Sequence, residues 1–346
     1  MSIVIDGGRV PNLLSRKKHS RSTSSSGNPE AQALKIALIN NMPDAALEDT
    51  EVQFFDLLAS AAGDIPISVK FYSLPDLPRS DAGQRHLSNY YFGIHDLLDS
   101  RFDGMIMTGT EPRQPDLRDE PYWSALTDVL DWAEHNTAST VLSCLAAHAG
   151  VLYSDAIPRH RLADKQFGVF AYEKIRAHAL TAGVGNRMQI PHSRWNEVRA
   201  DELTSCGYHV LTQSADAGVD LFVKKRKDSL FVHFQGHPEY GTRTLLKEYR
   251  RDIKRFLRRE RETYPTMPHG YFDSSAGELL TAFKVRVVSD RREDLIAGFP
   301  EAEVTESLRS TWQGSAATVS RNWLHYLISR KADAPAISSM TPAVRG

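Results

Sequence analysis

The chain has 346 residues, of which 41% are hydrophobic and 25% are charged. It can therefore bury a sizeable core, and it lacks the low hydrophobicity and high net charge that keep chains disordered. A formal net charge of -1 excludes a global field that would draw the protein to nucleic acid or to an anionic membrane, and two cysteines are too few for a disulfide scaffold. No stretch reaches the ~18 apolar residues that span a bilayer, and no apolar segment follows the N-terminal basic run as in a signal peptide, so the sequence predicts a cytoplasmic protein.

The two ends of the chain differ in composition from its middle. Residues 1–33 are polar and rich in serine, with too few apolar side chains to offset the entropy of ordering them, and we expect a flexible extension there. Within it, residues 3–5 can add a short edge strand. Residues 34–330 are predicted to form a single α/β domain, and residues 331–346 a loose tail.

Strands and helices alternate in the first half of the chain. Short apolar runs rich in β-formers predict buried strands at residues 34–39, 67–72, 104–109 and 139–143. Helical spacing of apolar residues predicts helices at residues 49–58, 122–134 and 146–151. This alternation favours the α/β class, with a doubly wound, mostly parallel sheet and flanking helices.

The second half is less regular. Neighbouring strands are predicted at residues 210–212, 221–223 and 230–234. A strongly basic helix is predicted over residues 242–258 and a last helix over residues 312–328. Residues 261–309 are weakly periodic and predict no element.

Cys144 directly follows a predicted strand and precedes a helix of small residues. In a doubly wound sheet, sites form outside the carboxyl ends of the strands. A strand-to-helix turn of this kind resembles a nucleophile elbow, and a helix N-terminus is a position at which thiols are reactive. The backbone N–H of Leu145 would then be free to stabilise an oxyanion, and the Gly109–Thr110 turn could supply a second donor. On position alone, a buried inert thiol is as good an interpretation as a reactive one.

His237 and Glu239 lie at the end of another predicted strand. A histidine with a carboxylate two residues on offers a base and the group that orients it, and Pro238 between them stiffens the backbone. The alternative is a surface loop that happens to contain these residues. Cys206, in a turn before a strand, has no evident partner in the sequence and is interpreted as structural.

Metal and nucleotide chemistry lack their sequence signatures. The 13 histidines are scattered, and neither H-E-x-x-H nor C-x-x-C spacing occurs, so no metal site is predicted. The glycine-rich phosphate loop and a well-placed G-x-G-x-x-G are also absent from the sequence. The sequence therefore predicts no bound cofactor.

Several short motifs, in order along residues 34–328, carry a resemblance to a known family. They are Asn40-Asn41-Met42-Pro43 with Thr50-Glu51, Phe102-Asp103-Gly104 with Thr108-Gly109, Tyr122-Trp123, Ser139-Thr140 with Cys144, Lys165 with Gly168-Val169, Pro191-His192-Ser193-Arg194, Gly236-His237-Pro238-Glu239-Tyr240, and Asn322-Trp323-Leu324 with Tyr326. Together they resemble the homoserine O-acyltransferase family of methionine biosynthesis, usually called homoserine O-succinyltransferases. The resemblance implies a fold like that of class I glutamine amidotransferases.

The resemblance also implies a two-step reaction and a set of residue roles. Cys144 would take the acyl group from acyl-CoA, which is a co-substrate and not a bound cofactor. His237, oriented by Glu239, would act as the base in both steps. Lys165, Ser193 and Arg251 fall at positions where the family binds its substrate, although Arg250 could serve in place of Arg251. The partners implied are therefore small molecules, with a homodimer possible.

The chain departs from the family pattern in two places. The family typically carries lysines after its Met-Pro pair, whereas this chain has Asp44-Ala45-Ala46. In the loop of residues 110–115, the position that helps to select the donor in the family is occupied by Arg113. Its guanidinium could pair with a succinyl carboxylate or close the pocket, and Glu111 nearby would oppose that charge unless Arg113 neutralises it. Succinyl is the favoured donor with acetyl as the alternative, and homoserine is the favoured acceptor with serine as the alternative.

Two functions from other classes of protein remain possible from the sequence. Cysteine with His-x-Glu also describes class I glutamine amidotransferases, but those usually show a G-x-C-x-G elbow, whereas Leu142 and Ala146 flank Cys144 here. A non-catalytic binding or regulatory protein that kept the fold would suit the missing lysines and the altered loop. The presence of cysteine, histidine and glutamate together argues against it.

Overall fold

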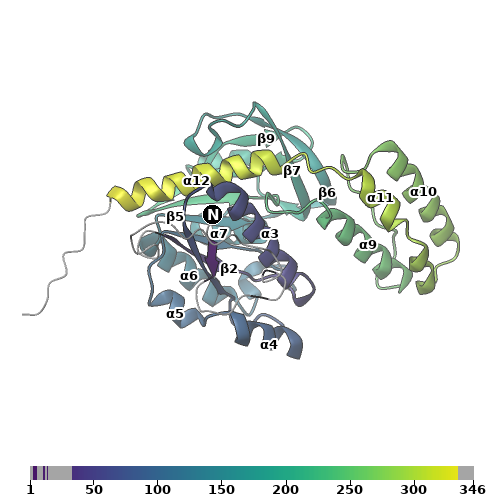
Figure 1. The fold of residues 1–346 in the computed structure, drawn as a ribbon, viewed down its shortest axis with the longest axis horizontal. Helices are drawn as coiled ribbons and strands as arrows, with labels where there is room; N and C mark the ends of the chain where they lie inside the picture. Colours follow the sequence, from purple (N-terminus) through teal and green to yellow (C-terminus); the bar gives the residue numbers. More distant parts are fainter. Residues whose placement is uncertain (1–2, 6–10, 12–13, 15–32, 334–346) are drawn as a thin grey trace, which may run out of the picture.

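The computed structural model describes residues 3–5, 11, 14 and 33–333, and at its centre lies an eight-stranded sheet (Figure 1). Its strands, in spatial order, are β1 (Ile3–Ile5), β3 (Ile67–Tyr72), β2 (Leu34–Ile39), β4 (Gly104–Met107), β5 (Ser139–Ser143), β12 (Ser229–Phe234), β11 (Leu221–Arg226) and β8 (His209–Val210). Neighbouring strands from β1 to β12 are parallel, and the last two are antiparallel. The predicted α/β class with a mostly parallel sheet is confirmed.

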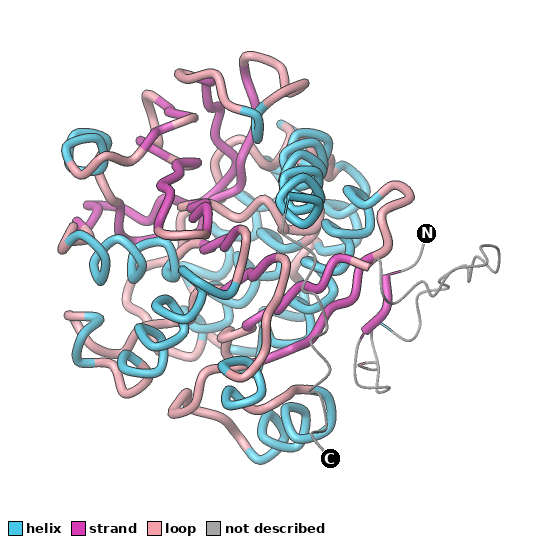
Figure 2. The backbone as a smooth tube through the Cα atoms, turned by 90° about the vertical axis from the view of Figure 1, so that its left-hand side faces the viewer, coloured by secondary structure: helices cyan, strands magenta, loops and turns pink. Residues whose placement is uncertain are grey.

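Helices cover both faces of this sheet, because alternate residues of each strand enter different cores. Ile36 and Leu38 of β2 join a core with α3 (Asp44–Ala62) and α12 (Gln313–Asp333). Ala37 and Ile39 join the opposite core with α6 (Trp123–Asn136) and α7 (Leu145–Asp155). Figure 2, turned by 90°, shows helices on either side of the strands. The sheet is therefore doubly wound, as the alternation of elements predicts.

A second, antiparallel sheet lies beside the first and was not predicted. Its order is β10 (Gly218–Val219), β9 (Thr212–Ser214), β6 (His160–Lys174) and β7 (Arg187–Glu197). The long strands β6 and β7 are paired with a register shift between Arg161 and Gln166. Many of the side chains of β6 are exposed or half-buried, so the apolar alternation that marks a strand is weak in the sequence.

The helices between β12 and α12 form a lobe with its own apolar core (Figure 1). They are α9 (Thr244–Leu257), α10 (Ser274–Ser289) and α11 (Glu301–Ser307). The sequence predicted no element over residues 261–309, and this is wrong, because α10 and α11 lie there. The outer face of α10 carries exposed valines, with Val285 69% exposed, and such residues blur the amphipathic period.

Three further helices were also missed, all of them short. They are α4 (Asp81–Tyr90), α5 (Ile94–Leu98) and α8 (Ala200–Ser205). Few of their side chains are buried, so the sequence offers little helical periodicity to detect.

Element boundaries deviate from the predictions in ways that follow local chemistry. Helix α3 begins at Asp44, directly after Pro43, and not near residue 49. The strand predicted at residues 210–212 is two strands, β8 and β9, in different sheets. Strand β1 lies at the sheet edge as expected, and the rest of residues 1–33 except 11, 14 and 33 lies outside the described residues.

The C-terminal boundary also lies further along the chain than expected. Helix α12 continues to Asp333, three residues into the segment predicted as a loose tail. The remainder of that tail lies outside the described residues, and the assignment of residues 34–330 as one domain stays a prediction.

Helix α12 lies close against β4 because Gly104 has no side chain. A Cβ atom at Gly104 would lie 2.8 Å from the Trp323 ring and 2.7 Å from Leu327. The Trp323 indole is buried, and its N–H donates to Ser139 Oγ at 2.9 Å. Trp323 therefore holds the helix both by apolar packing and by one hydrogen bond.

We expect Trp323→Ala to lower the free energy of unfolding by roughly 3 to 5 kcal/mol, because it leaves a cavity where the indole packs. Urea unfolding followed by circular dichroism measures this change. The matched control is Val285→Ala on exposed α10, which should stay within about 0.5 kcal/mol. Equal effects of the two substitutions would contradict this account of α12.

Candidate active site

Cys144 occupies a sharp turn between β5 and α7. Its backbone has φ 53° and ψ -113°, in the left-handed half of backbone space that non-glycine residues rarely adopt. The turn is held on both sides, since the Cys144 N–H donates to Phe234 O at 2.7 Å and the Cys144 carbonyl accepts from Ala147 N at 3.0 Å. This is the geometry of the nucleophile elbow that the sequence predicts.

His237 and Glu239 follow the neighbouring parallel strand β12. His237 Nδ1 lies 2.8 Å from Glu239 Oε1, and both residues are buried. The backbone N–H of His237 donates to Pro191 O at 2.8 Å. The Tyr240 ring stacks on the imidazole, with 4.2 Å between ring centroids. The imidazole is thus fixed in position by a carboxylate, a backbone bond and an aromatic face.

The His237 imidazole is set up to hold a proton. Burial by itself lowers the pKa of His237, but the adjacent Cys144 sulfur and then the Glu239 carboxylate, by charge and by hydrogen bonding, raise that pKa well above its ordinary value. Cysteine, histidine and glutamate therefore form one connected group. Such a group can move a proton between sulfur and imidazole, as nucleophilic catalysis requires.

Asp220 supports the backbone of the histidine loop. Its Oδ1 accepts from Gly236 N at 2.6 Å, and it is fully buried. Burial raises the pKa of Asp220 to about 7. His192 Nε2 lies 3.6 Å from Asp220 Oδ1, but burial, with help from Arg194, holds the pKa of His192 well below its ordinary value. The His192–Asp220 contact is therefore not an ion pair at neutral pH.

Gly109 lies directly against the start of α7. A Cβ atom at Gly109 would fall 2.9 Å from Leu145 N and 2.8 Å from Leu145 Cβ, so only glycine permits this approach. Gly109, Thr110 and Leu145 line the same small cavity. The two turns expected to supply oxyanion donors are thus adjacent.

The loop of residues 110–115 is tied down by a buried carboxylate. Glu120 accepts from Arg113 N at 2.5 Å and from Gln114 N at 2.7 Å. The Arg113 side chain is exposed. The Glu111 carboxylate lies 3.9 Å from Arg255 of α9, so α9 borders this loop and offers Glu111 a cation other than Arg113.

The three residues expected to bind substrate all contact Glu248 of α9. Ser193 donates to Glu248 Oε2 at 2.5 Å, and Lys165 and Arg251 lie 3.6 and 3.7 Å from the same oxygen. The hydroxyl of Tyr240, whose ring stacks on His237, donates to Glu248 Oε1 at 2.6 Å. Lys165, Ser193 and Arg251 therefore lie together around Glu248 and form with it the Glu248 cluster, which reaches the imidazole through Tyr240.

The structure distinguishes Arg251 from Arg250. Arg251 pairs with Asp252 at 2.9 Å beside the Glu248 cluster, whereas Arg250 points to Glu301 of α11 at 3.4 Å. Glu248 and Asp252 were missed by the sequence analysis. The spacing of Glu248 three residues before Arg251 on a predicted helix is the signal that could have found it.

The remaining sequence predictions concern Cys206 and metal binding. Cys206 is half-buried at the end of α8, and its backbone N–H donates to Glu202 O. Its place in the helix cap fits the structural role that the sequence suggests. Within residues 3–5, 11, 14 and 33–333, no three His, Cys, Asp or Glu side chains are grouped so that they could hold a metal ion. In the same part of the chain, no helix combines the length and apolarity needed to cross a bilayer.

A family model described as homoserine O-succinyltransferase matches residues 10–334. The chain belongs to this family. The homoserine O-succinyltransferase of Rhodopseudomonas palustris is 43% identical over 299 residues, which are 86% of this chain and 90% of that protein. That of Bradyrhizobium japonicum is 44% identical over 296 residues, or 85% and 90% of the two chains. The resemblance predicted from short motifs is thus confirmed over most of the sequence.

Solved structures are similar to this member of the homoserine O-succinyltransferase family at much lower identity. A glutamine amidotransferase from Methylobacillus flagellatus is 14% identical, with a TM-score of 0.45 over 85% of this chain and 95% of that one. A glutamine amidotransferase from Thermotoga maritima is 10% identical, with a TM-score of 0.43 over 85% and 98%.

We expect Asp220→Asn to change the pH dependence of stability. Because the folded pKa is raised from 3.8 to about 7, the wild type loses stability as pH rises from about 4 to 7, whereas the amide does not titrate. The unfolding free energy of the wild type relative to Asp220→Asn should fall by about 4 kcal/mol across that window. Urea unfolding at several pH values measures it.

Exposed Asp164 provides the matched control for this experiment. Asp164→Asn should leave the shape of the stability curve unchanged. A difference between wild type and Asp220→Asn that does not vary with pH would show that Asp220 stays ionised in the folded protein.

Proposed function

We propose that the protein transfers a succinyl group from succinyl-CoA to the hydroxyl of L-homoserine, a step of methionine biosynthesis, by way of a thioester on Cys144. The observation that carries the proposal is the connected group of Cys144, His237 and Glu239 at one edge of the sheet, in a member of the homoserine O-succinyltransferase family. Acyl-CoA acts as a co-substrate, and the reaction takes place in the cytoplasm.

In the first half-reaction, His237 takes the thiol proton and the Cys144 sulfur attacks the thioester carbonyl. The negative charge on the carbonyl oxygen is stabilised by N–H groups at Leu145 and in the Gly109–Thr110 turn. The intermediate collapses, the bond to the CoA sulfur breaks, and the leaving thiolate takes the proton from His237. The products are free CoA and succinyl-Cys144.

In the second half-reaction, Cys144 changes from nucleophile to leaving group. His237 takes the proton of the homoserine hydroxyl, whose oxygen attacks the succinyl-Cys144 carbonyl at the same oxyanion position. The bond to Cys144 breaks, and His237 returns its proton to the sulfur. Glu239 keeps Nδ1 of the ring engaged, so that the other ring nitrogen faces the reacting groups.

The Glu248 cluster has the charges that an α-amino acid requires. The guanidinium of Arg251 and the ammonium of Lys165 suit its carboxylate, and the carboxylate of Glu248 suits its ammonium. Tyr240 joins Glu248 to His237, so an amino acid bound here holds its side-chain hydroxyl toward the base. Serine, which is one carbon shorter, is the competing acceptor.

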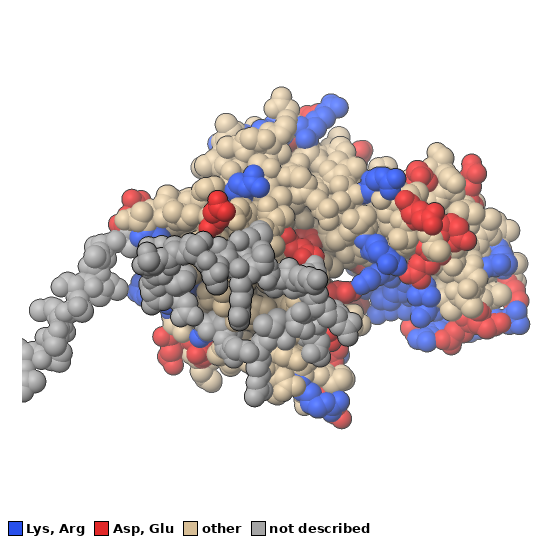
Figure 3. Space-filling view, viewed as in Figure 1, with Lys and Arg blue, Asp and Glu red and all other residues tan. Residues whose placement is uncertain are grey.

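The donor is proposed to enter past the loop of residues 110–115. Lys and Arg side chains gather on the lobe that contains α9 (Figure 3), and Arg255 of α9 contacts Glu111 of the loop. These cations favour the approach of an anionic CoA. Exposed Arg113, whose backbone is fixed by Glu120, can attract the free carboxylate of a succinyl group.

We expect the wild type mixed with succinyl-CoA alone to gain the mass of one succinyl group, because the thioester accumulates when no acceptor is present. Adding L-homoserine should discharge it, and Cys144→Ala should give no adduct. Intact-mass spectrometry measures each step. Parallel samples with acetyl-CoA, with serine and with glutamine compare the alternative donor, acceptor and hydrolase reactions.

Three results of that series would each remove a part of the proposal. Full transfer by Cys144→Ala would exclude the thioester. If serine discharges the thioester faster than homoserine, serine and not homoserine is the acceptor. Ammonia release from glutamine without any acylation would favour the glutaminase reading.

We expect Arg113→Glu to lower kcat/KM for succinyl-CoA roughly thirtyfold relative to acetyl-CoA, a change of about 2 kcal/mol. A pair of charges near 4 Å in water is worth about 1 kcal/mol, and reversing one of them replaces attraction with repulsion. Steady-state rates with the two donors measure the ratio. Arg118→Glu, at an exposed site near this loop, is the matched control, and a loss of equal size with both donors would exclude charge selection by Arg113.

A further inference from the structure

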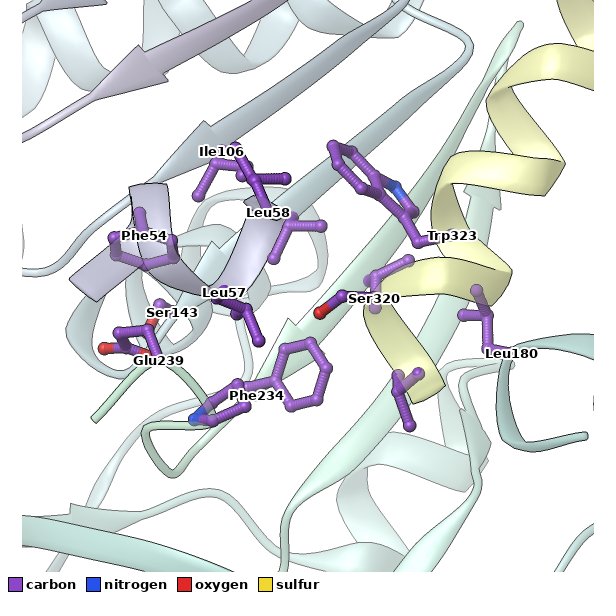
Figure 4. A pocket seen from close by; sticks show the side chains of 14 residues that line it. Phe54, Leu57, Leu58, Ile106, Ser143, Leu180, Phe234, Glu239, Ser320 and Trp323 are labelled. Carbon is purple, nitrogen blue, oxygen red and sulfur yellow. The ribbon is translucent and has the colours of Figure 1, made fainter. Parts of the chain in front are cut away.

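An apolar cavity lies behind the His237–Glu239 pair, between α3, α12 and the sheet (Figure 4). Its volume, measured as space open to the centre of a water molecule, is about 30 Å³. A buried water needs at least about 10 to 15 Å³ measured in this way, together with two or more polar partners. The cavity is therefore large enough for one water, and its polar groups decide whether one is held.

Two of the atoms at this cavity are polar, buried and unpaired. Neither Ser143 Oγ nor Glu239 Oε2 has a hydrogen-bond partner among the residues that the structure describes. Both residues line the cavity, and Figure 4 shows them at the same end of it, while Ser320 of α12 faces the interior. A buried hydroxyl and a buried carboxylate oxygen without partners are costly, so each calls for a donor or acceptor within the cavity.

Ser143 is placed here by the sheet itself. On β5, Val141 and Ser143 face the cavity, and the next residue is Cys144. Glu239 enters from the loop after β12. Its Oε1 contacts His237 Nδ1, and its Oε2 has no hydrogen-bond partner among the described residues. The orientation of the catalytic imidazole thus depends on the Glu239 carboxylate, and only one of the two oxygens of that carboxylate has a direct partner.

We propose that Ser143 is a positioning residue, which holds Glu239 through a water bound in this cavity. The Ser143 hydroxyl donates to the water, and the water donates to Glu239 Oε2. This fixes the carboxylate so that Oε1 stays on Nδ1 of His237 and the ring stays directed at Cys144. The inference rests on the proposed function, since its effect is a faster acylation of Cys144.

The matched pair Ser143→Thr and Ser143→Val tests it, because the two side chains have the same shape and differ in the hydroxyl. We expect Ser143→Val to form succinyl-Cys144 about tenfold more slowly than Ser143→Thr, with the KM for succinyl-CoA unchanged, since a hydrogen bond to a charged group is lost. Rapid quenching and intact-mass spectrometry measure the rate of acylation. Equal rates for the two variants would overturn the proposal.

A second comparison shows whether Ser143 acts through Glu239. In a Glu239→Gln background the difference between Ser143→Thr and Ser143→Val should disappear, because there is no carboxylate left to orient. A tenfold difference that persists there would mean that Ser143 acts in another way. If neither substituted side chain allows folding, Ser143→Ala against the wild type, in both backgrounds, makes the same comparison.

Ser139→Ala controls for simple loss of stability. Ser139 lies on the same strand and face, and its buried hydroxyl bonds to Leu230 O and Trp323. This variant should lower the melting temperature and leave the rate of acylation unchanged. A slowing as large as that of Ser143→Val would assign both effects to stability and overturn the proposal.

A wild type that never acylates would instead count against the proposed function. A crystal structure gives the direct test of the bound water. We expect an ordered water in hydrogen-bond contact with both Ser143 Oγ and Glu239 Oε2, and a dry cavity would overturn the proposal.

Discussion

The parallel register of β4, β5 and β12 is the constraint on which the rest of the active site depends. Met107 of β4 lies opposite Leu142 of β5, and Ser143 lies opposite Phe234 of β12. The chain leaves all three strands within a few residues of those pairs, so the ends of the strands lie side by side. A shift of one residue in either pairing would turn alternate side chains to the opposite face and separate Cys144 from His237 and Glu239.

The site is held together by polar groups, some buried and some half-buried, in contrast to the apolar cores behind it. Glu239 pairs with His237, Glu248 with two hydroxyls and two cations, and Asp220 with the backbone of Gly236. Buried charges of this kind are costly unless each has a partner, and the loss of one partner leaves the other exposed to that cost.

The departures from the family pattern lie at the rim of the site and leave its centre intact. Asp44, at the first position of α3, stands where the family is expected to carry lysines. It accepts hydrogen bonds from Ser80 and Arg79, which precede α4, and so ties the start of α3 to the start of α4. Arg113 occupies a loop whose backbone is fixed by Glu120. If this loop selects the acyl donor as proposed, differences in it change the selection without disturbing the elbow or the histidine.

The sequence alone determined the parallel half of the fold, because a buried strand leaves a local signal. Residues 34–39, 67–72 and 139–143 were predicted with the bounds that the structure gives, and the turn at Cys144 followed from the strand that precedes it. The His237–Glu239 pair was also visible, since both residues follow one strand at a spacing of two. These features depend on residues that are neighbours in the chain.

Tertiary structure decided what depends on distant segments. Glu248 gathers Lys165 of β6 and Ser193 of β7 beside Arg251 of α9, and no local pattern in the sequence joins Lys165 and Ser193 to that helix. Ser143 and Glu239 line one cavity only because β5 and β12 are adjacent, and that cavity exists only when α3 and α12 pack on the sheet. Periodicity reports which face of an element is buried, but packing alone decides which side chains meet there.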